Sequence, residues 1–480
     1  MEIDAVWTLL KQKLVAAEKR TVLTWAFSYV TMGSVLCEPH RRLPVTTLHC
    51  PPAHSKRRTL HVTIPKHSTR QSRALRLRGG FFRYAPHTAL AVLNVLPGFA
   101  HAQSSITLFG IADNGLQFLS GQGVAKSTGS AGHPIAYNNR SSISMKSGAH
   151  YGDRWGFLGS EDLGDGNSAV FRLENGFNIN TGASSNAADQ FSREAWVGLD
   201  SKRFGRLTFG RQYEATTDLL ELYGNDFGTG AGTYPGDISN LDDSIRINNS
   251  VKYISNDLGG FTVDLLYGFG NVAGATGSAS SYAGGFKYEQ GAFGGGVTYQ
   301  HYNNAYTSAN TWAGSADSNV GSSVTAGYAG ARSVQIVSAV SQYKMGKAAI
   351  GANMAYTQYT PSLLSSFKKT EAYDSFGLGA KYNISPSLWV GASYSYTFGQ
   401  SVGQTDARPQ YHSVATSAYY ALSKRTQLYA IVAYQHAKGK TFDAYGNIVD
   451  TTASIGDSAN GASSGSGNQF LIRVGIANKF

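Results

Sequence analysis

Apolar and polar residues alternate through the last strand-length segment of the chain, and this pattern most limits what the chain can fold into. Counting back in twos from the C-terminus gives a mostly apolar face, Phe480, Asn478, Ile476, Val474, Ile472 and Phe470, and the residues between are mostly polar or small. A tilted strand that crosses a bilayer needs about 9–11 residues of this kind. The final strand of a soluble sandwich would also alternate, so the rest of the chain must decide.

The same alternation recurs from Ser104 onwards in short runs that turn signals separate. Between Leu388 and Phe398, for example, alternate residues are aliphatic or aromatic, and those between are mostly Gly, Ser or Thr. The runs predict sixteen strands, at 104–119, 140–161, 167–180, 191–201, 205–213, 246–257, 259–270, 280–290, 292–303, 332–344, 348–360, 373–384, 387–399, 410–422, 426–438 and 467–480.

The connections between these runs alternate between tight turns and long loops. The long loops are 120–139, 181–190, 214–245, 271–279, 304–331, 361–372, 400–409 and 439–466. No helical period stands out after residue 102, and no apolar stretch is long enough for a transmembrane helix. An even number of strands with all long loops at one end predicts an all-β fold, a sixteen-stranded antiparallel up-and-down transmembrane β-barrel.

The basic charge of the chain belongs to its front end. Residues 1–102 hold 15 of the 41 Lys+Arg and 4 of the 30 Asp+Glu, which leaves 41 − 15 = 26 basic and 30 − 4 = 26 acidic residues after them. A net charge of +11 would favour nucleic-acid binding, but the body from residue 103 is neutral, so no nucleic-acid partner is expected.

A secretory signal is predicted directly before the body. Residues 83–102 combine Arg83, the apolar run Leu90–Leu96 and the cleavage pattern Ala100-His101-Ala102, which is the order found in signal peptides. Residues 1–82 are predicted to be an upstream extension, either disordered or included by a start assigned too early. The barrel is then expected to span 103–480.

Several motifs of the body resemble, in the same order, those of Gram-negative general-diffusion porins, most like the β-proteobacterial branch. They are SITLFG at 105–110, DRWGFLGSEDLG at 153–164, AVFRLENGF at 169–177, FSREAWVGL at 191–199, GRLTFGRQY at 205–213 and NSVKY at 249–253. The terminal Phe480 resembles the assembly signal of bacterial outer-membrane barrels. The resemblance covers 103–480, and residues 1–82 lie outside it.

The resemblance implies a homotrimer in the cell outer membrane whose barrels form water-filled channels for passive diffusion of small hydrophilic solutes and ions. It implies that the third long loop, 214–245, folds into the lumen and narrows it. The implied partners are outer-membrane lipid, lipopolysaccharide and the barrel-assembly machinery, which would recognise the C-terminal strand. Neither a catalytic activity nor a cofactor is implied.

Charged residues are predicted to face each other across the narrow section. Strand alternation directs Arg172 and Glu174 to the lumen, opposite in parity to Phe171 and Leu173, and Arg154 likewise. The resemblance places Arg154, Arg193, Arg211 and Arg246 on the wall facing the third loop, and with Arg172 these form the expected basic wall. The expected acidic residues of the loop are Glu221, Asp226, Asp237, Asp242 and Asp243. Such an arrangement would set up a transverse field, whereas salt bridges that only hold the wall together are the alternative.

Two other functions stay open at this point. A ligand-specific channel would carry a track of aromatic residues along the lumen, to which Tyr234 and Trp389 could belong. An outer-membrane hydrolase would need a cluster of His with Asp or Ser at the rim. The five histidines of the body, at 133, 150, 301, 412 and 436, are far apart and lack the spacing of metal ligands.

Overall fold

The computed structural model of the chain describes residues 104–128, 134–148, 150–224, 227, 230, 234–242, 245–305, 311–318, 320–400, 402, 407–456 and 464–480, with the backbone alone for 124–128 and 134–138. The expected extension, 1–82, and the expected signal peptide, 83–102, lie outside these residues.

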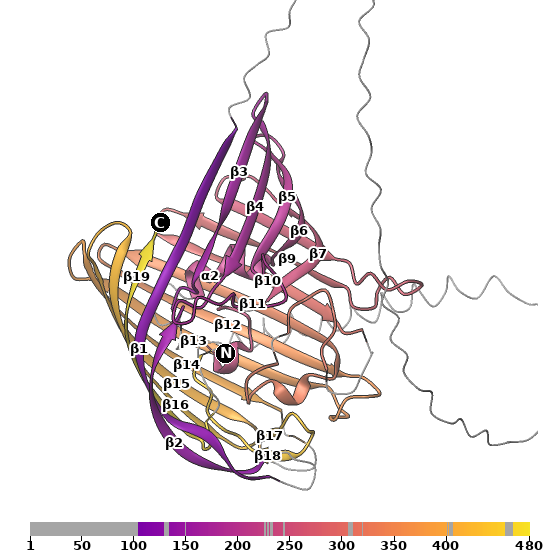
Figure 1. Ribbon diagram of the computed structural model, residues 1–480, viewed down its shortest axis with the longest axis vertical. Coiled ribbons are helices and arrows are strands. Elements are labelled where there is room, and N and C mark those ends of the chain that lie inside the picture. Colours follow the sequence, from indigo (N-terminus) through magenta and orange to yellow (C-terminus); the bar gives the residue numbers. More distant parts are fainter. Residues whose placement is uncertain are drawn as a thin grey trace, which may run out of the picture. The chain divides into compact units, whose positions relative to one another are not determined.

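Almost all regular structure in the described residues is β-strand (Figure 1). The strands are β1 (Ser105–Thr128), β2 (Pro134–Ser147), β3 (Arg154–Gly164), β4 (Asn167–Gly176), β5 (Glu194–Ser201), β6 (Gly205–Tyr213), β7 (Arg246–Ile254), β8 (Phe261–Gly268), β9 (Ser281–Gln290), β10 (Phe293–Asn303), β11 (Ala331–Met345), β12 (Ala348–Pro361), β13 (Glu371–Asn383), β14 (Leu388–Gly399), β15 (Gln410–Ala421), β16 (Thr426–Lys438), β17 (Lys440–Phe442), β18 (Ile448–Asp450) and β19 (Asn468–Lys479). The helical segments are α2 (Ala215–Gly224), η2 (Pro235–Asp237) and η3 (Ala326–Tyr328). None of the described helices has the length and apolar character needed to cross a membrane.

The long strands close into one antiparallel barrel. Seventeen of the described strands form a single sheet, and β1 closes the ring by pairing with β19, where Leu116 lies opposite Val474. Both β2 and β3 pair with β1, so they are two parts of one interrupted strand, and 17 − 1 = 16 strands make up the barrel. The predicted sixteen-stranded up-and-down barrel is confirmed.

The prediction of one continuous strand over 140–161 is wrong. Ser147 pairs with Asn114 and Arg154 pairs with Ile111, so residues 148–153 stand opposite only two residues of β1. The carboxylate of Asp113 accepts hydrogen bonds from the backbone N–H groups of His150 and Tyr151, at 2.7 and 2.9 Å. Because side-chain acceptors take over from the strand ladder here, the backbone can leave the sheet and rejoin it.

Other predicted strand ends also differ from the structure. β1 extends to Thr128 instead of ending at 119, β4 ends at Gly176, before the predicted 180, and β5 begins at Glu194, after the predicted 191. The long loop 439–466 contains the small hairpin of β17 and β18. The sequence showed no helical period, yet α2 lies in the third long loop; isolated helices of this length are marginal, and packing decides whether they form.

The two faces of the barrel wall have opposite character. On β1, Leu108 is 57% exposed and Leu116 54%, whereas Asp113 and Gln117, of the other parity, are 0% and 1% exposed. Exposed apolar residues outside and polar residues inside are the pattern of a barrel whose outer surface contacts lipid.

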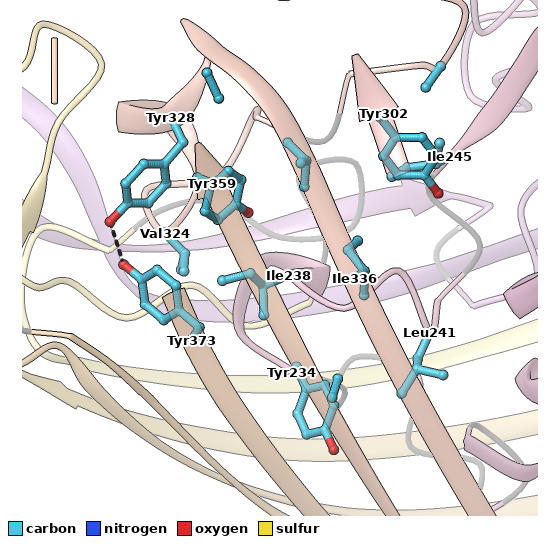
Figure 2. Close-up of a cluster of buried hydrophobic side chains, with 14 of the residues drawn as sticks. Tyr234, Ile238, Leu241, Ile245, Tyr302, Val324, Tyr328, Ile336, Tyr359 and Tyr373 are labelled. Carbon is cyan, nitrogen blue, oxygen red and sulfur yellow. Dashed lines mark hydrogen bonds between the residues drawn. The ribbon is translucent and has the colours of Figure 1, made fainter. Parts of the chain in front are cut away.

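An apolar cluster fills part of the interior on the side of β10–β13. It joins residues of the third loop to residues of the loop between β10 and β11, and to the inner faces of the strands. Figure 2 labels Tyr234, Ile238, Leu241, Ile245, Tyr302, Val324, Tyr328, Ile336, Tyr359 and Tyr373 of this cluster, all buried. The hydroxyl groups of Tyr328 and Tyr373 are hydrogen-bonded at 2.9 Å. Loops that share a core with the wall have fixed positions inside the lumen.

Candidate functional site

The third loop enters the barrel through α2. Glu214 caps this helix, because its carboxylate accepts hydrogen bonds from the backbone N–H groups of Thr216 and Thr217 at 2.6 and 3.2 Å. The same carboxylate accepts a bond of 2.8 Å from the Asn240 side-chain amide, so one buried residue joins the two ends of the loop. Burial raises the pKa of Glu214 to about 7, although its N–H donors favour the charged form.

Glycines on the inner face of the wall receive the loop. The ring of Phe227 lies against Gly351 and Gly379 of β12 and β13, where an added Cβ would come within 2.6 and 2.2 Å of the ring. At Gly391 of β14 an added Cβ would meet the Phe227 carbonyl oxygen at 1.8 Å. A side chain at any of these positions would therefore displace the loop.

Three of the predicted wall arginines converge on Glu174. This carboxylate is fully buried, and its Oε1 lies 2.7 Å from Arg193 Nε and 3.7 Å from Arg154 Nη1. Arg172 donates to Oε2 of Glu174 from Nε at 3.0 Å. Arg172 Nε also lies 2.6 Å from Glu194 Oε2, so two carboxylates of the wall itself hold these guanidinium groups in position.

Tyr213 connects two of the arginines. Its hydroxyl accepts a hydrogen bond of 2.6 Å from Arg193 Nη2 and another from Arg246 Nη2. The guanidinium carbon of Arg246 lies 4.5 Å from the centre of the Tyr213 ring, which is the geometry of a cation–π contact. Arg172, Arg193 and Arg246 thus belong to one contact chain along the wall.

Arg211 is held at a different place. The register of β6 and β7 shifts between Gly210 and Gln212, where Gly210 has a φ of 141°, and such bulges redirect side chains. The Arg211 guanidinium makes paired bonds of 2.8 and 2.7 Å to Asp317, in the loop between β10 and β11. Its Nε donates to the carbonyl oxygen of Ser192 at 2.8 Å.

A buried lysine joins α2 to the same wall. Lys252 of β7 forms an ion pair with Asp218 of α2 and donates to the carbonyl oxygen of Tyr213 at 3.0 Å. Asp264 of β8, itself buried, lies 3.5 Å from the lysine nitrogen. The ion pair between Lys252 and Asp218 keeps the start of the third loop close to β7.

The predicted acidic residues of the loop are placed in several environments. Glu221 lies in the last turn of α2 and is partly exposed. Asp237 is buried and accepts a hydrogen bond of 3.1 Å from the backbone N–H of Asp242. Asp226 and Asp243 lie outside the described residues. That these carboxylates act on the pore stays a prediction.

The terminal Phe480 lies at the seam of the barrel. Its backbone exchanges two hydrogen bonds of 3.0 Å with Gly110 of β1, and the residue as a whole is 47% exposed. An added Cβ at Gly110 would lie 2.3 Å from the ring, so the absence of a side chain at Gly110 lets the ring cover the seam.

Sequence reasoning left several residues of this site out of the predicted set. Glu174 was predicted to face the lumen but not to hold the arginines, and Glu194 could have been included because it has the strand parity of the lumenal face. Tyr213 and Lys252 lie in the predicted strands without any signal of their role. Asp317 gave no signal, because it lies in a long loop and 106 positions from the arginine that it binds.

Comparison with known proteins identifies the family. The family model for Gram-negative porins matches residues 88–440. An outer membrane porin of Bordetella pertussis is 36% identical over 184 residues, 38% of this chain and 47% of the relative. Outer membrane porin protein 32 of Delftia acidovorans is 32% identical over 213 residues, 42% and 55% of the two chains. The chain thus spans about half the length of these relatives.

Among solved structures, the anion-selective porin of Comamonas acidovorans has a similar fold. The TM-score is 0.54 at 22% identity, over 79% of this chain and 100% of that porin. The likeness concerns the fold, and it agrees with the closed barrel of sixteen strands. Since the family model covers most of the described barrel, the chain belongs to the Gram-negative porin family.

Proposed function

We propose that this chain forms a water-filled channel through which small hydrophilic solutes and ions diffuse passively across the outer membrane, where this family resides. The proposal rests on the polarity of the barrel wall, which is the reverse of that of a water-soluble protein. Apolar side chains are exposed outside, and arginines on the inside keep 13–27% of their side chains accessible. Charged groups that stay in contact with water inside a membrane barrel line an aqueous path.

We further propose that Arg154, Arg172, Arg193, Arg211 and Arg246 line the narrowest section. These residues come from the half of the barrel formed by β3–β7, whereas α2 and Phe227 lie on the inner face of β8–β14. A loop on one side and cations on the other restrict the water between them to a charged passage, which would favour hydrated, dipolar solutes over apolar ones.

Single-channel recording in planar bilayers tests the channel function. We expect a conductance that is large, proportional to voltage and insensitive to added sugars or nucleosides, because diffusion through an open aqueous pore has no saturable step. A conductance that one solute class blocks at low concentration would indicate a ligand-specific channel. A silent protein with hydrolytic activity would indicate an enzyme and contradict the proposal.

We infer that the protein assembles as a homotrimer, as the family resemblance implies. The support is apolar surface beside the seam, where Ile106, Leu108, Val474 and Ile476 are exposed in the single chain. An apolar outer face of this kind can pack against a neighbouring barrel in place of lipid, and close packing favours association within the bilayer. A trimer should migrate on a denaturing gel as a large species that heating converts to a monomer, and a monomer before and after heating would contradict the inference.

A further inference from the structure

A segment of the loop between β10 and β11 pairs with the first residues of β7, which β8 does not reach. β8 pairs with β7 only over Ser250–Ile254, so the first residues of β7 have an open edge. There, Asn248 N–H donates to the Ser315 carbonyl at 2.7 Å, and Asp317 N–H donates to the Arg246 carbonyl at 2.9 Å. An isolated bridge between Ile247 and Ala316 lies between these two bonds. Strand pairing of this kind fixes the backbone from Ser315 to Asp317.

Further contacts hold the same segment in place. The indole N–H of Trp312 donates to the Ala316 carbonyl at 3.0 Å, and the Ser315 hydroxyl bonds to that of Ser281 on β9 at 2.7 Å. These contacts hold the backbone of the loop in place, so the carboxylate of Asp317 is positioned next to the guanidinium of Arg211. The two residues are 106 positions apart in the sequence.

The Asp317–Arg211 pair has the geometry of a strong, directional ion pair. Both carboxylate oxygens bind separate guanidinium nitrogens, at 2.8 and 2.7 Å, and the Asn248 side-chain oxygen accepts a further bond of 2.8 Å from Nη1. The two side chains are 17% and 26% exposed, so the pair is in contact with water. Asp317 also lines a lumenal cavity of about 20 Å³ together with Ile238, Tyr302 and Tyr359, three residues that Figure 2 labels in the interior cluster.

We propose that Asp317 is a selectivity-determining residue of the channel, because it compensates the charge of Arg211 on the arginine wall. The proposal rests on the proposed channel function. A wall arginine without its counter-charge attracts anions and repels cations, and the same residue in a paired state has little net effect on either. The loop between β10 and β11 would then set how many uncompensated cations the lumen presents.

Substitution of the pair tests this in three variants, with reversal potentials measured in a KCl gradient. Asp317→Asn keeps the size and polarity of the side chain, and should raise the chloride-to-potassium permeability ratio roughly two- to fourfold at about 0.1 M salt. Arg211→Gln leaves Asp317 as an extra anion, and should lower the ratio by a similar factor. The double variant should return the ratio close to that of the wild type.

A matched control removes the same kind of charge from an ion pair outside the site. Asp450 pairs with Lys440 at 2.5 Å in the exposed hairpin of β17 and β18, so Asp450→Asn should leave the permeability ratio unchanged. A purely structural role of Asp317 would instead alter conductance or stability in both the single and the double variant without the opposite shifts in selectivity.

The outcomes separate this proposal from the channel function. A wild-type protein that conducts, with an Asp317→Asn variant of unchanged selectivity, overturns the role of Asp317 and leaves the channel intact. A double variant that is as anion-selective as Asp317→Asn also overturns it, because compensation of Arg211 would then not be the cause. A wild-type protein without conductance contradicts the channel function itself.

Discussion

Glu174→Gln should make the channel markedly more anion-selective and should also lower its thermal stability. Glu174 is fully buried and contacts Arg154, Arg172 and Arg193, so its neutralisation leaves three guanidinium groups with one counter-charge fewer. Removing one partner of a buried ion pair commonly costs about 3–5 kcal/mol. Reversal potentials in a salt gradient measure the selectivity, and thermal unfolding in detergent measures the stability.

Asp200→Asn provides the comparison for Glu174. Asp200 pairs with Arg206 at 2.8 Å on the same barrel half, but both side chains are well exposed, at 32% and 44%. Exposed pairs contribute about 0–1 kcal/mol, so this variant should unfold close to the wild-type temperature. If Glu174→Gln behaves like Asp200→Asn in both measurements, the Glu174 cluster neither stabilises the wall nor sets its charge.

Deletion of Phe480 should sharply reduce the yield of assembled barrel. The deletion removes both backbone hydrogen bonds to Gly110 and the aromatic ring that covers the seam between β1 and β19. A closed barrel depends on this pairing, because an open edge in the bilayer leaves backbone groups without partners. The measurement is the fraction of protein that shows heat-modifiable migration after expression in outer membranes.

Two substitutions at the same position separate the side chain from the backbone. Phe480→Ala keeps the backbone pairing but loses the ring, and Phe480→Tyr keeps both. We expect assembly to fail for the alanine variant if the assembly machinery recognises a terminal aromatic residue, and to proceed for the tyrosine variant. Wild-type yield from the deletion variant would refute a role of Phe480 in both recognition and closure.

Alternation along the chain was enough to predict the barrel, because a strand in a membrane wall has only two faces and each faces a different solvent. The same argument predicted that Arg172 and Glu174 share a face, and the two residues are in contact. Period and parity are local properties, and so they can be read without knowing which strands are neighbours.

The partners of the charged residues could not be predicted in the same way. Arg211 leaves the regular alternation at a bulge, and its counter-charge, Asp317, is brought to it by a loop that pairs with β7. The helix α2 was missed because its formation depends on the Glu214 cap and on contacts of its buried face with the wall. Apart from the Glu214 cap, which is a local contact, these features depend on tertiary contacts that no local pattern encodes.

The break between β2 and β3 affects how the number of residues between these two strands can vary. From Ser147 to Arg154 the chain advances seven positions, while their partners Asn114 and Ile111 are three apart, an excess of 7 − 3 = 4. Because this excess is even, Ile143 and Met145 before the break keep the outward phase of Trp155 and Phe157 after it. Segment 148–153 has no partners in the register with β1, so residues gained or lost within it change only its own length, and pairing with β1 keeps the facing of β2 and β3. The chain can therefore vary in length at this interior break independently of the long loops that connect the strands.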